Sequence, residues 1–169
     1  MNICQVVGYK NSGKTTLMTQ LIKFFSDDGV QVASLKHHGH GGEPSVVDNT
    51  DSHQHMQAGS LISGVQGEQI SQFTFNTDMN LDRLIELYRY FQVELLLVEG
   101  YKKADYPKVV IVRTQRDLSL LDELSTIIAV VTWEPELREN VTEFPVFDMD
   151  EINADIARLA DCIRRCLNG

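Results

Sequence analysis

The sequence predicts an α/β fold of three layers, in which helices cover a mostly parallel β-sheet and a β-hairpin is added to it. A short apolar stretch at residues 3–7 is followed by apolar side chains at helical spacing over residues 14–25 and by a second apolar stretch at residues 30–35. Strand, helix and strand in this order form a βαβ unit, which favours parallel pairing with a right-handed crossover. Strands and helices alternate again later in the chain, and this alternation is typical of a three-layer domain.

The stretch after this unit departs from the alternation. Residues 37–55 are polar and rich in Gly, Asn, Asp, Ser and Thr, which is typical of a long functional or mobile loop. A short helix is expected over residues 52–58. Apolar residues at 61–65 and 70–75 then flank a turn that contains Gly67, and this pattern predicts a β-hairpin.

The second half of the chain returns to strands and helices. The spacing of its apolar residues predicts a helix over residues 81–91, strands over residues 94–98, 108–112 and 126–131, and a closing helix over residues 151–167. We therefore expect the carboxyl ends of several parallel strands to meet at one edge of the sheet, where doubly wound folds bind their ligands.

Length and charge limit the classes of protein that remain. The chain has 169 residues, so we expect one nucleotide-binding domain over residues 1–169, with the hairpin as an insert at about residues 60–76. It carries 15 Lys and Arg against 24 Asp and Glu, a net charge of −9. An acidic surface repels nucleic acid and anionic membranes, so we expect neither as a partner.

The cysteines and the N-terminus indicate a cytoplasmic setting. Cys4, Cys162 and Cys166 form no CxxC pair, which favours reduced thiols over a disulfide framework. The first residues show no basic leader, and no apolar run approaches the ~20 residues that a membrane span needs.

The strongest motif lies between the first strand and the first helix. It fits GxxxxGK[ST] without a gap, and its glycines let successive backbone N–H groups form an anion nest at a helix N-terminus. A Gly-rich turn that only caps a helix is the structural alternative. We predict a P-loop NTPase fold whose phosphate-binding residues are Gly8, Tyr9, Lys10, Asn11, Ser12, Gly13, Lys14, Thr15 and Thr16.

Four side chains are candidates for chemistry at this loop. Lys14 would reach the β- and γ-phosphates, and the Thr15 hydroxyl would bind Mg²⁺. Glu99 follows the strand at 94–98, where it either binds the metal through water, orients the attacking water, or is only a structural carboxylate. Asp51 either belongs to a helix N-cap or faces the nucleotide and its Mg²⁺. We expect Lys14 and Glu99 to be catalytic and Thr15, Asp51 and Glu99 to hold the metal.

The segment that would contact the nucleobase is incomplete. GTPases of the Ras type recognise guanine with an N/T-K-x-D segment that follows a strand. Residues 130–136 lie at about this place but lack the Lys and the Asp. The choice between guanine and adenine is therefore open from local motifs.

Three other groups of residues have both a structural and a functional interpretation. All the histidines lie between residues 37 and 55, where they either belong to a solvated loop or bind Zn²⁺ or Ni²⁺. The basic residues 101–108 are either a solvated loop or attract a second anionic ligand. Cys162 and Cys166 are either packed thiols or metal ligands. The histidines are His37, His38, His40, His53 and His55.

Three segments together resemble the molybdopterin-guanine dinucleotide biosynthesis protein B (MobB) family: residues 8–16, residues 50–59 and residues 97–102. The phosphate loop alone is generic, whereas the Asp-Ser to Ala-Gly segment and the Val-Glu-Gly-Tyr-Lys segment make the resemblance specific. It implies a GTP-binding accessory protein with weak GTPase activity that uses Mg²⁺. It also implies a homodimer with a mixed sheet that assists the molybdopterin guanylyltransferase (MobA) and other molybdenum-cofactor assembly proteins.

Two other functions remain as alternatives. A small-molecule P-loop kinase would need an Arg-rich lid, for which Arg113 and Arg116 are the closely spaced mid-chain candidates. A nickel or zinc metallochaperone GTPase would use the histidine cluster.

Overall fold

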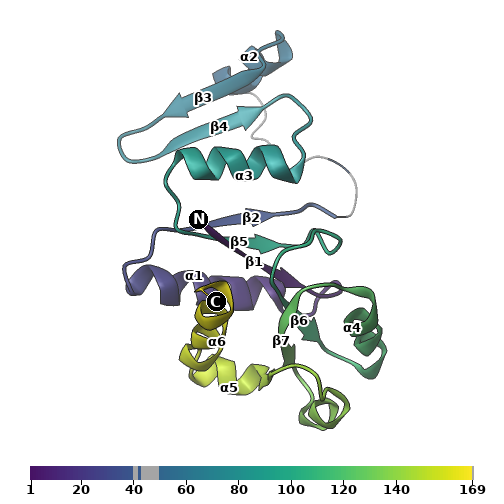
Figure 1. Ribbon diagram of the computed structural model, residues 1–169. Helices are drawn as coiled ribbons and strands as arrows, with labels where there is room; N and C mark the ends of the chain where they lie inside the picture. The colour runs from purple at the N-terminus through teal and green to yellow at the C-terminus, as the bar shows by residue number, and fades with distance from the viewer. Residues whose placement is uncertain (40–41, 43–49, 169) are drawn as a thin grey trace. The chain divides into compact units, whose positions relative to one another are not determined.

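The computed structural model describes residues 1–39, residue 42 and residues 50–168 (Figure 1). The chain divides into two compact units, one of Met1–Gly39 with Tyr88–Gly169 and one of His40–Leu87. Each unit is described by itself below. The expectation of one nucleotide-binding domain over residues 1–169 stays a prediction.

The larger unit is built on a six-stranded sheet. Its strand order is β2-β5-β1-β6-β7-β8, and the pairings that join these strands are all parallel. The central strands are apolar on both faces, which is expected of a parallel sheet with helices on each side. The predicted α/β fold is thus confirmed. The strands are β1 (Asn2–Val7), β2 (Val32–Lys36), β5 (Leu95–Glu99), β6 (Lys108–Val112), β7 (Ile127–Thr132) and β8 (Val146–Asp148).

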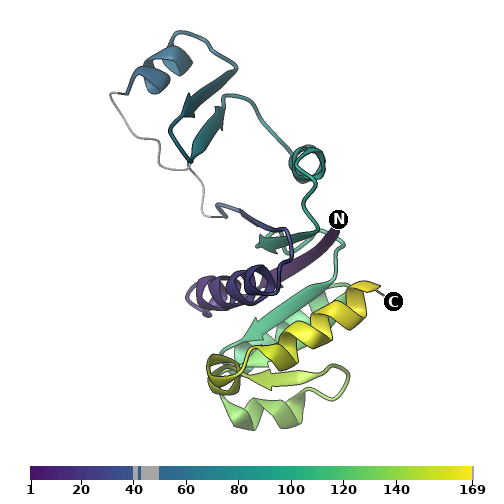
Figure 2. The ribbon, with the colours of Figure 1, turned by 90° about the vertical axis from the view of Figure 1, so that its left-hand side faces the viewer.

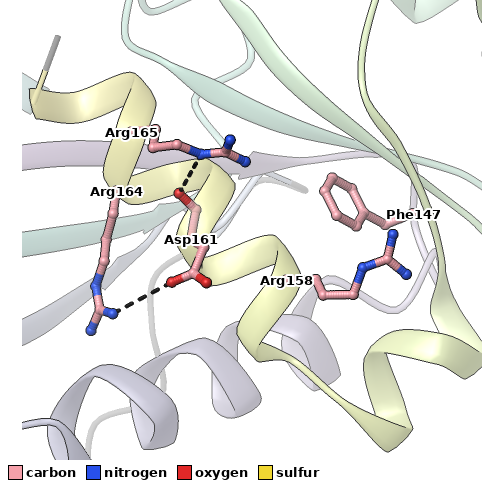
Figure 3. A pocket seen from close by; sticks show the side chains of 5 residues that line it. All are labelled: Phe147, Arg158, Asp161, Arg164 and Arg165. Carbon is pink, nitrogen blue, oxygen red and sulfur yellow. Dashed lines mark hydrogen bonds and ion pairs between the residues drawn. The ribbon is translucent and has the colours of Figure 1, made fainter.

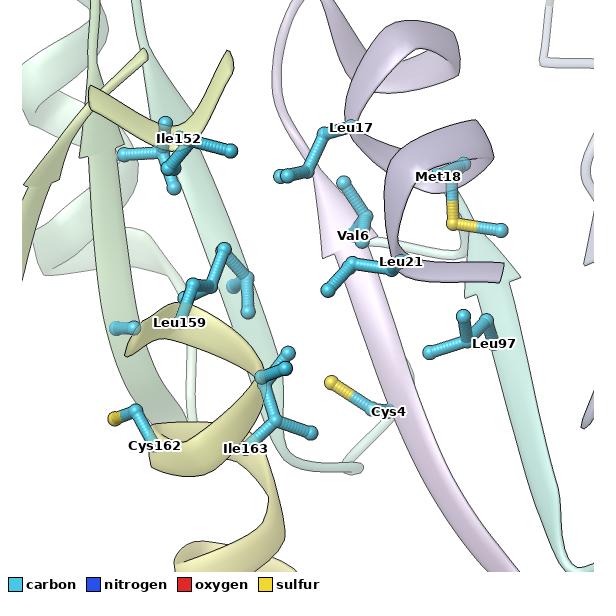
Figure 4. Packing of buried hydrophobic residues seen from close by; sticks show 14 of the residues in the cluster. Cys4, Val6, Leu17, Met18, Leu21, Leu97, Ile152, Leu159, Cys162 and Ile163 are labelled. Carbon is cyan, nitrogen blue, oxygen red and sulfur yellow. The ribbon is translucent and has the colours of Figure 1, made fainter. Parts of the chain in front are cut away.

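Three helices cover one face of this sheet: α1 (Lys14–Asp27), α5 (Met149–Ala154) and α6 (Ala157–Asn168). Helix α6 lies against β7, β1 and α1, as both views show (Figures 1 and 2). Leu17 and Leu21 of α1 belong to the same buried cluster as Leu159 and Ile163 of α6 (Figure 4). All four side chains are fully buried, and each burial stabilises the fold by roughly 1.5–3 kcal/mol.

Shorter helices close the opposite face. They are η1 (Gln115–Leu118), α4 (Ser119–Glu123) and η2 (Pro135–Asn140), which supply Leu120 and Leu137 to a second core against Val110 and Val130. The Asp117 side chain caps the start of η1, and its Oδ2 accepts from the Arg113 N–H at 2.8 Å. None of these helices was expected, because each is too short to show a periodic pattern.

The closing helix differs from the prediction of one helix over residues 151–167. The helix is interrupted at Asp155, whose extended backbone (φ −151°, ψ 96°) ends α5. The Asp155 carboxylate then accepts from the Ala157 N–H at 3.0 Å at the start of α6. Because Asp bonds readily to nearby backbone N–H groups, it favours a helix boundary over a helix interior.

The smaller unit contains the predicted hairpin. Strands β3 (Ile62–Gln66) and β4 (Ser71–Phe75) pair antiparallel in a separate two-stranded sheet (Figures 1 and 2). Among the described strands the antiparallel pairing is confined to the hairpin, and the mixed sheet that the family resemblance implied for a homodimer stays a prediction. The Phe73 ring covers Gly64 across the strands, where a Cβ would lie 2.9 Å from Phe73 Cε1.

Helix α2 (Asp51–Gln57) precedes the hairpin and contacts β3. Ser63 of β3 donates its hydroxyl to the Ser52 carbonyl of α2 at 2.9 Å. Helix α3 (Leu81–Tyr90) crosses the boundary of the two units, and within the larger unit Tyr88 donates to the Ser34 carbonyl at 2.8 Å.

Within residues 1–39, 42 and 50–168, no helix combines the length and the apolar character that crossing a bilayer requires.

The three cysteines are free thiols in different surroundings. Cys4 of β1 and Cys162 of α6 are buried in the core (Figure 4), whereas Cys166 is exposed. Burial raises the pKa of the Cys4 thiol to about 12, and burial also raises the pKa of Cys162. Because the thiolate is the reactive form, the two buried thiols are chemically protected.

We expect a thiol reagent at pH 8 to modify Cys166 alone in the native protein and all three cysteines after unfolding. The measurement is mass spectrometry of the labelled chain with time. Cys166→Ser should remove the fast reaction, and fast labelling of Cys4 in that variant would contradict the burial described here.

Candidate functional site

The loop between β1 and α1 takes a shape that depends on its glycines. Residues 8–13 form the loop, and Lys14, Thr15 and Thr16 begin α1. Gly13 has φ +94°, in the left-handed region, and a Cβ there would lie 2.8 Å from the Trp133 ring. A Cβ on Gly8 would lie 2.6 Å from Ser12 Oγ. The predicted phosphate loop is thus a tight turn at a helix N-terminus, as anion binding requires.

Two side chains from neighbouring strands hold this loop. Arg113, after β6, donates Nη1 to the Asn11 carbonyl at 2.6 Å, and Trp133, after β7, donates Nε1 to the Ser12 carbonyl at 2.8 Å. In a trans peptide the N–H points opposite to the carbonyl, so the Gly13 N–H points away from Trp133. These two hydrogen bonds fix the orientation of the peptide groups after Asn11 and Ser12, which an anion bound in the loop would contact.

Sequence reasoning assigned neither Arg113 nor Trp133 to the loop. Each is the first residue after an apolar strand, at the sheet edge where ligands of such folds bind. The position after a strand is the sequence signal that points to both residues. Assigning them to the loop also requires the strand order, in which β6 is the neighbour of β1 and β7 is the neighbour of β6.

Lys14 lies over the loop that precedes it. Its Nζ donates to the Tyr9 carbonyl at 2.5 Å. Burial lowers the pKa of Lys14, the Glu99 carboxylate opposes this, and the charges of Lys102 and Lys36 add to it. Several cations therefore converge at this edge of an acidic protein.

Thr15 and Glu99 come together as the sequence predicted. The Thr15 hydroxyl donates to Glu99 Oε2 at 3.3 Å. Glu99 is 7% exposed and lies at the carboxyl end of β5, level with Val6 of β1. Lys36 Nζ, from the end of β2, lies 3.1 Å from Glu99 Oε1 and 3.5 Å from Thr15 Oγ1.

A buried side chain of the neighbouring strand β1 holds the loop after β5. Gln5 of β1 donates Nε2 to the carbonyls of Gly100 and Tyr101 at 2.9 and 2.8 Å. The Tyr101 ring lies 4.3 Å from the His37 ring, and Lys102 Nζ lies 4.0 Å above the Tyr9 ring. The basic segment 101–108 therefore begins beside the phosphate loop, as expected.

Asp51 is the first residue of α2, in the smaller unit. The preceding residue, Thr50, caps that helix by accepting from the His53 N–H at 3.3 Å. The cap predicted here is confirmed, whereas a role of Asp51 toward a nucleotide stays a prediction.

The described histidines make separate contacts. His40 lies outside the described residues. Among the others, His37 packs on Tyr101, and the His53 ring lies 3.0 Å from Gln57 Nε2. No group of three or more His, Cys, Asp or Glu suited to a metal ion occurs among the described residues.

A cavity of about 640 Å³ lies elsewhere, between β8 and α6 (Figure 3). Its basic side chains are engaged within the fold. Arg164 lies 3.6 Å from the Asp161 carboxylate, Arg165 donates to the Asp161 carbonyl at 3.3 Å, and Arg158 pairs with Glu151 at 3.5 Å. None of the predicted site residues lines it. The lining residues are Phe147, Arg158, Asp161, Arg164 and Arg165.

Comparison with known proteins identifies the family. The family model described as Molybdopterin guanine dinucleotide synthesis protein B, or MobB, matches residues 3–133. The chain belongs to the MobB family. This matched span of the MobB family contains the phosphate loop and Glu99, and it ends at Trp133.

Individual relatives agree with this assignment. A Bacillus subtilis (strain 168) protein named probable molybdopterin-guanine dinucleotide biosynthesis adapter protein is 41% identical over 150 residues, covering 88% of this chain and 86% of that protein. The crystal structure of Bacillus subtilis MobB has a TM-score of 0.82 at 38% identity and covers 100% of this chain and 99% of that one. A Bacillus stearothermophilus MobB homolog has a TM-score of 0.76 at 34% identity, with coverage of 98% and 99%.

We expect Gly13→Ala to lower the free energy of unfolding by about 2–4 kcal/mol, because Ala adds both left-handed strain and a clash with Trp133. Urea denaturation measures the change. Gly29→Ala is the matched control: Gly29 also has positive φ (+80°) but has nothing within 4 Å, so about 1–2 kcal/mol is expected. Equal losses in the two variants would show that Trp133 does not pack on the loop.

Proposed function

We propose that this MobB family member binds GTP with Mg²⁺ at residues 8–16, hydrolyses it slowly, and serves as an adapter in molybdopterin guanine dinucleotide synthesis. In that role it assists the guanylyltransferase and forms a homodimer. The observation that carries the proposal is the glycine-shaped loop at the N-terminus of α1, with Thr15 and Glu99 side by side next to it. Family membership and the name of the Bacillus subtilis relative support the pathway.

The loop suits a phosphate chain. Gly8 and Gly13 leave room where side chains would otherwise fill the turn. Ser12 Oγ is buried without a hydrogen-bond partner in the described structure, and an anionic oxygen would supply one. Lys14 brings a positive charge to the start of α1, where the helix dipole also favours anions.

Thr15 and Glu99 suit a magnesium ion. Mg²⁺ prefers oxygen ligands, and a hydroxyl and a carboxylate oxygen lie 3.3 Å apart here. When bound, the metal would neutralise charge on the phosphates. Burial of Glu99 limits its hydration, so the carboxylate is held toward Thr15 and Lys36.

Slow hydrolysis is consistent with the other charged groups. Rapid phosphoryl transfer commonly needs an additional arginine at the transition state. Arg113 uses its guanidinium on the Asn11 carbonyl and so acts in shaping the loop. The choice of guanine rests on the family, because residues 130–136 place Trp133 against Gly13 and carry no Lys or Asp for base recognition.

Lys14→Ala should weaken GTP binding at least about fiftyfold, since it removes a charged contact to phosphate. Titration calorimetry with GTP and ATP in Mg²⁺ gives the affinities. Lys23→Ala is the matched control, because Lys23 lies exposed on the same helix and pairs with Asp27, four residues further along it, at 2.7 Å. If neither nucleotide bound the unchanged protein, or if Lys14→Ala bound GTP normally, the proposed nucleotide site would be wrong.

We expect the guanylyltransferase to be retained by this protein in a pull-down, and more strongly with GTP than without it. In this pull-down, Lys14→Ala should lose the effect of GTP and keep the basal interaction. Equal retention of an unrelated nucleotidyltransferase would contradict the adapter role.

Light scattering of the purified chain measures its oligomeric state, for which a homodimer is expected.

A further inference from the structure

Lys36 occupies an unusual position next to the predicted magnesium ligands. Its ammonium lies 3.1 Å from Glu99 Oε1 and 3.5 Å from Thr15 Oγ1, and these two ligand side chains are themselves 3.3 Å apart. A positive charge of the protein's own chain thus contacts the same carboxylate and hydroxyl that would hold a divalent cation.

The sheet places Lys36 there. Strands β2 and β5 pair in parallel with Lys36 opposite Glu99, at the carboxyl edge of both strands. The Glu99 side chain is only 10% exposed, whereas the Lys36 side chain is 61% exposed. The carboxylate is therefore held in place, and the lysine is free to leave it toward solvent.

We propose that Lys36 is an internal cation that competes with Mg²⁺ for Thr15 and Glu99. This inference rests on the proposed nucleotide site. A bound Mg²⁺ requires carboxylate and hydroxyl oxygens at about 2.0–2.1 Å in a nearly octahedral arrangement. An ammonium in contact with the same two oxygens blocks that arrangement and repels the ion, so Lys36 must withdraw before the metal is bound.

The competition has two consequences. Without metal, Lys36 supplies a positive charge in direct contact with the buried Glu99 carboxylate, and removing a contacting cation from a buried carboxylate is costly. With nucleotide, the concentration of Mg²⁺ needed for tight binding is set partly by the Lys36–Glu99 pair. Lys36 is therefore a positioning residue that sets the magnesium requirement of the site.

Lys36→Met should lower the Mg²⁺ concentration for half-maximal GTP binding about tenfold, because it removes the cation that is paired with Glu99. The readout is the fluorescence of Trp133, the one tryptophan of the sequence, which contacts the loop through the Ser12 carbonyl. GTP is held constant and Mg²⁺ is varied, and calorimetry at selected Mg²⁺ concentrations gives the binding constants independently. Lys36→Arg, which keeps the charge, should show a midpoint at or above that of the unchanged protein.

Lys102→Met is the matched control. Lys102 also contributes positive charge near Lys14, but its ammonium lies over the Tyr9 ring. Its loss should move the Mg²⁺ midpoint less than about twofold if direct contact with Glu99 is what matters. Thermal unfolding of each variant checks that it is folded.

The outcomes separate the two proposals. If the unchanged protein binds GTP but Lys36→Met keeps the same midpoint, or if Lys36→Met and Lys102→Met shift it equally, the competition by Lys36 is wrong and the nucleotide site stands. If calorimetry finds no GTP binding at any Mg²⁺ concentration, the proposed function fails, and the competition fails with it.

Discussion

Strands β2, β5 and β1 pair in parallel, and their register sets Lys36, Glu99 and Val6 at one level of the sheet. The phosphate loop starts two residues after Val6, so the carboxylate of β5 and the ammonium of β2 necessarily lie beside it. A shift of one residue in a strand would turn its side chains to the opposite face. The meeting of Thr15 with Glu99 therefore depends on this register.

Local charge matters more at this edge than the net charge of the chain. The protein carries a net charge of −9, yet the surroundings of Lys14 include Lys36 and Lys102 with Glu99 as the opposing carboxylate. Over a few ångströms such a cluster outweighs distant surface charges, which salt screens beyond about 10 Å. An anion site on an acidic protein is thus physically consistent.

The loop is shaped from both sides of its backbone. Glycines allow its turn, and the indole of Trp133 and the guanidinium of Arg113 hold its carbonyls from β7 and β6. Preorganised donors need little rearrangement when a charged ligand arrives. Arg113 also connects the loop to η1, because its backbone N–H donates to the Asp117 carboxylate. Through this contact the small helices on the second face of the sheet support the site.

The sequence by itself determined the βαβ unit, the glycine-shaped turn between β1 and α1, the hairpin and the position of Glu99, because these depend on local spacing of apolar residues and glycines. It did not determine β8, α4 or the break at Asp155, which are short and stabilised by packing against distant strands. Only the tertiary structure decided that Arg113, Trp133 and Lys36 contact the loop or its acidic neighbour. Each of them is far from its partner in the chain, and only the order and register of the parallel strands bring them together.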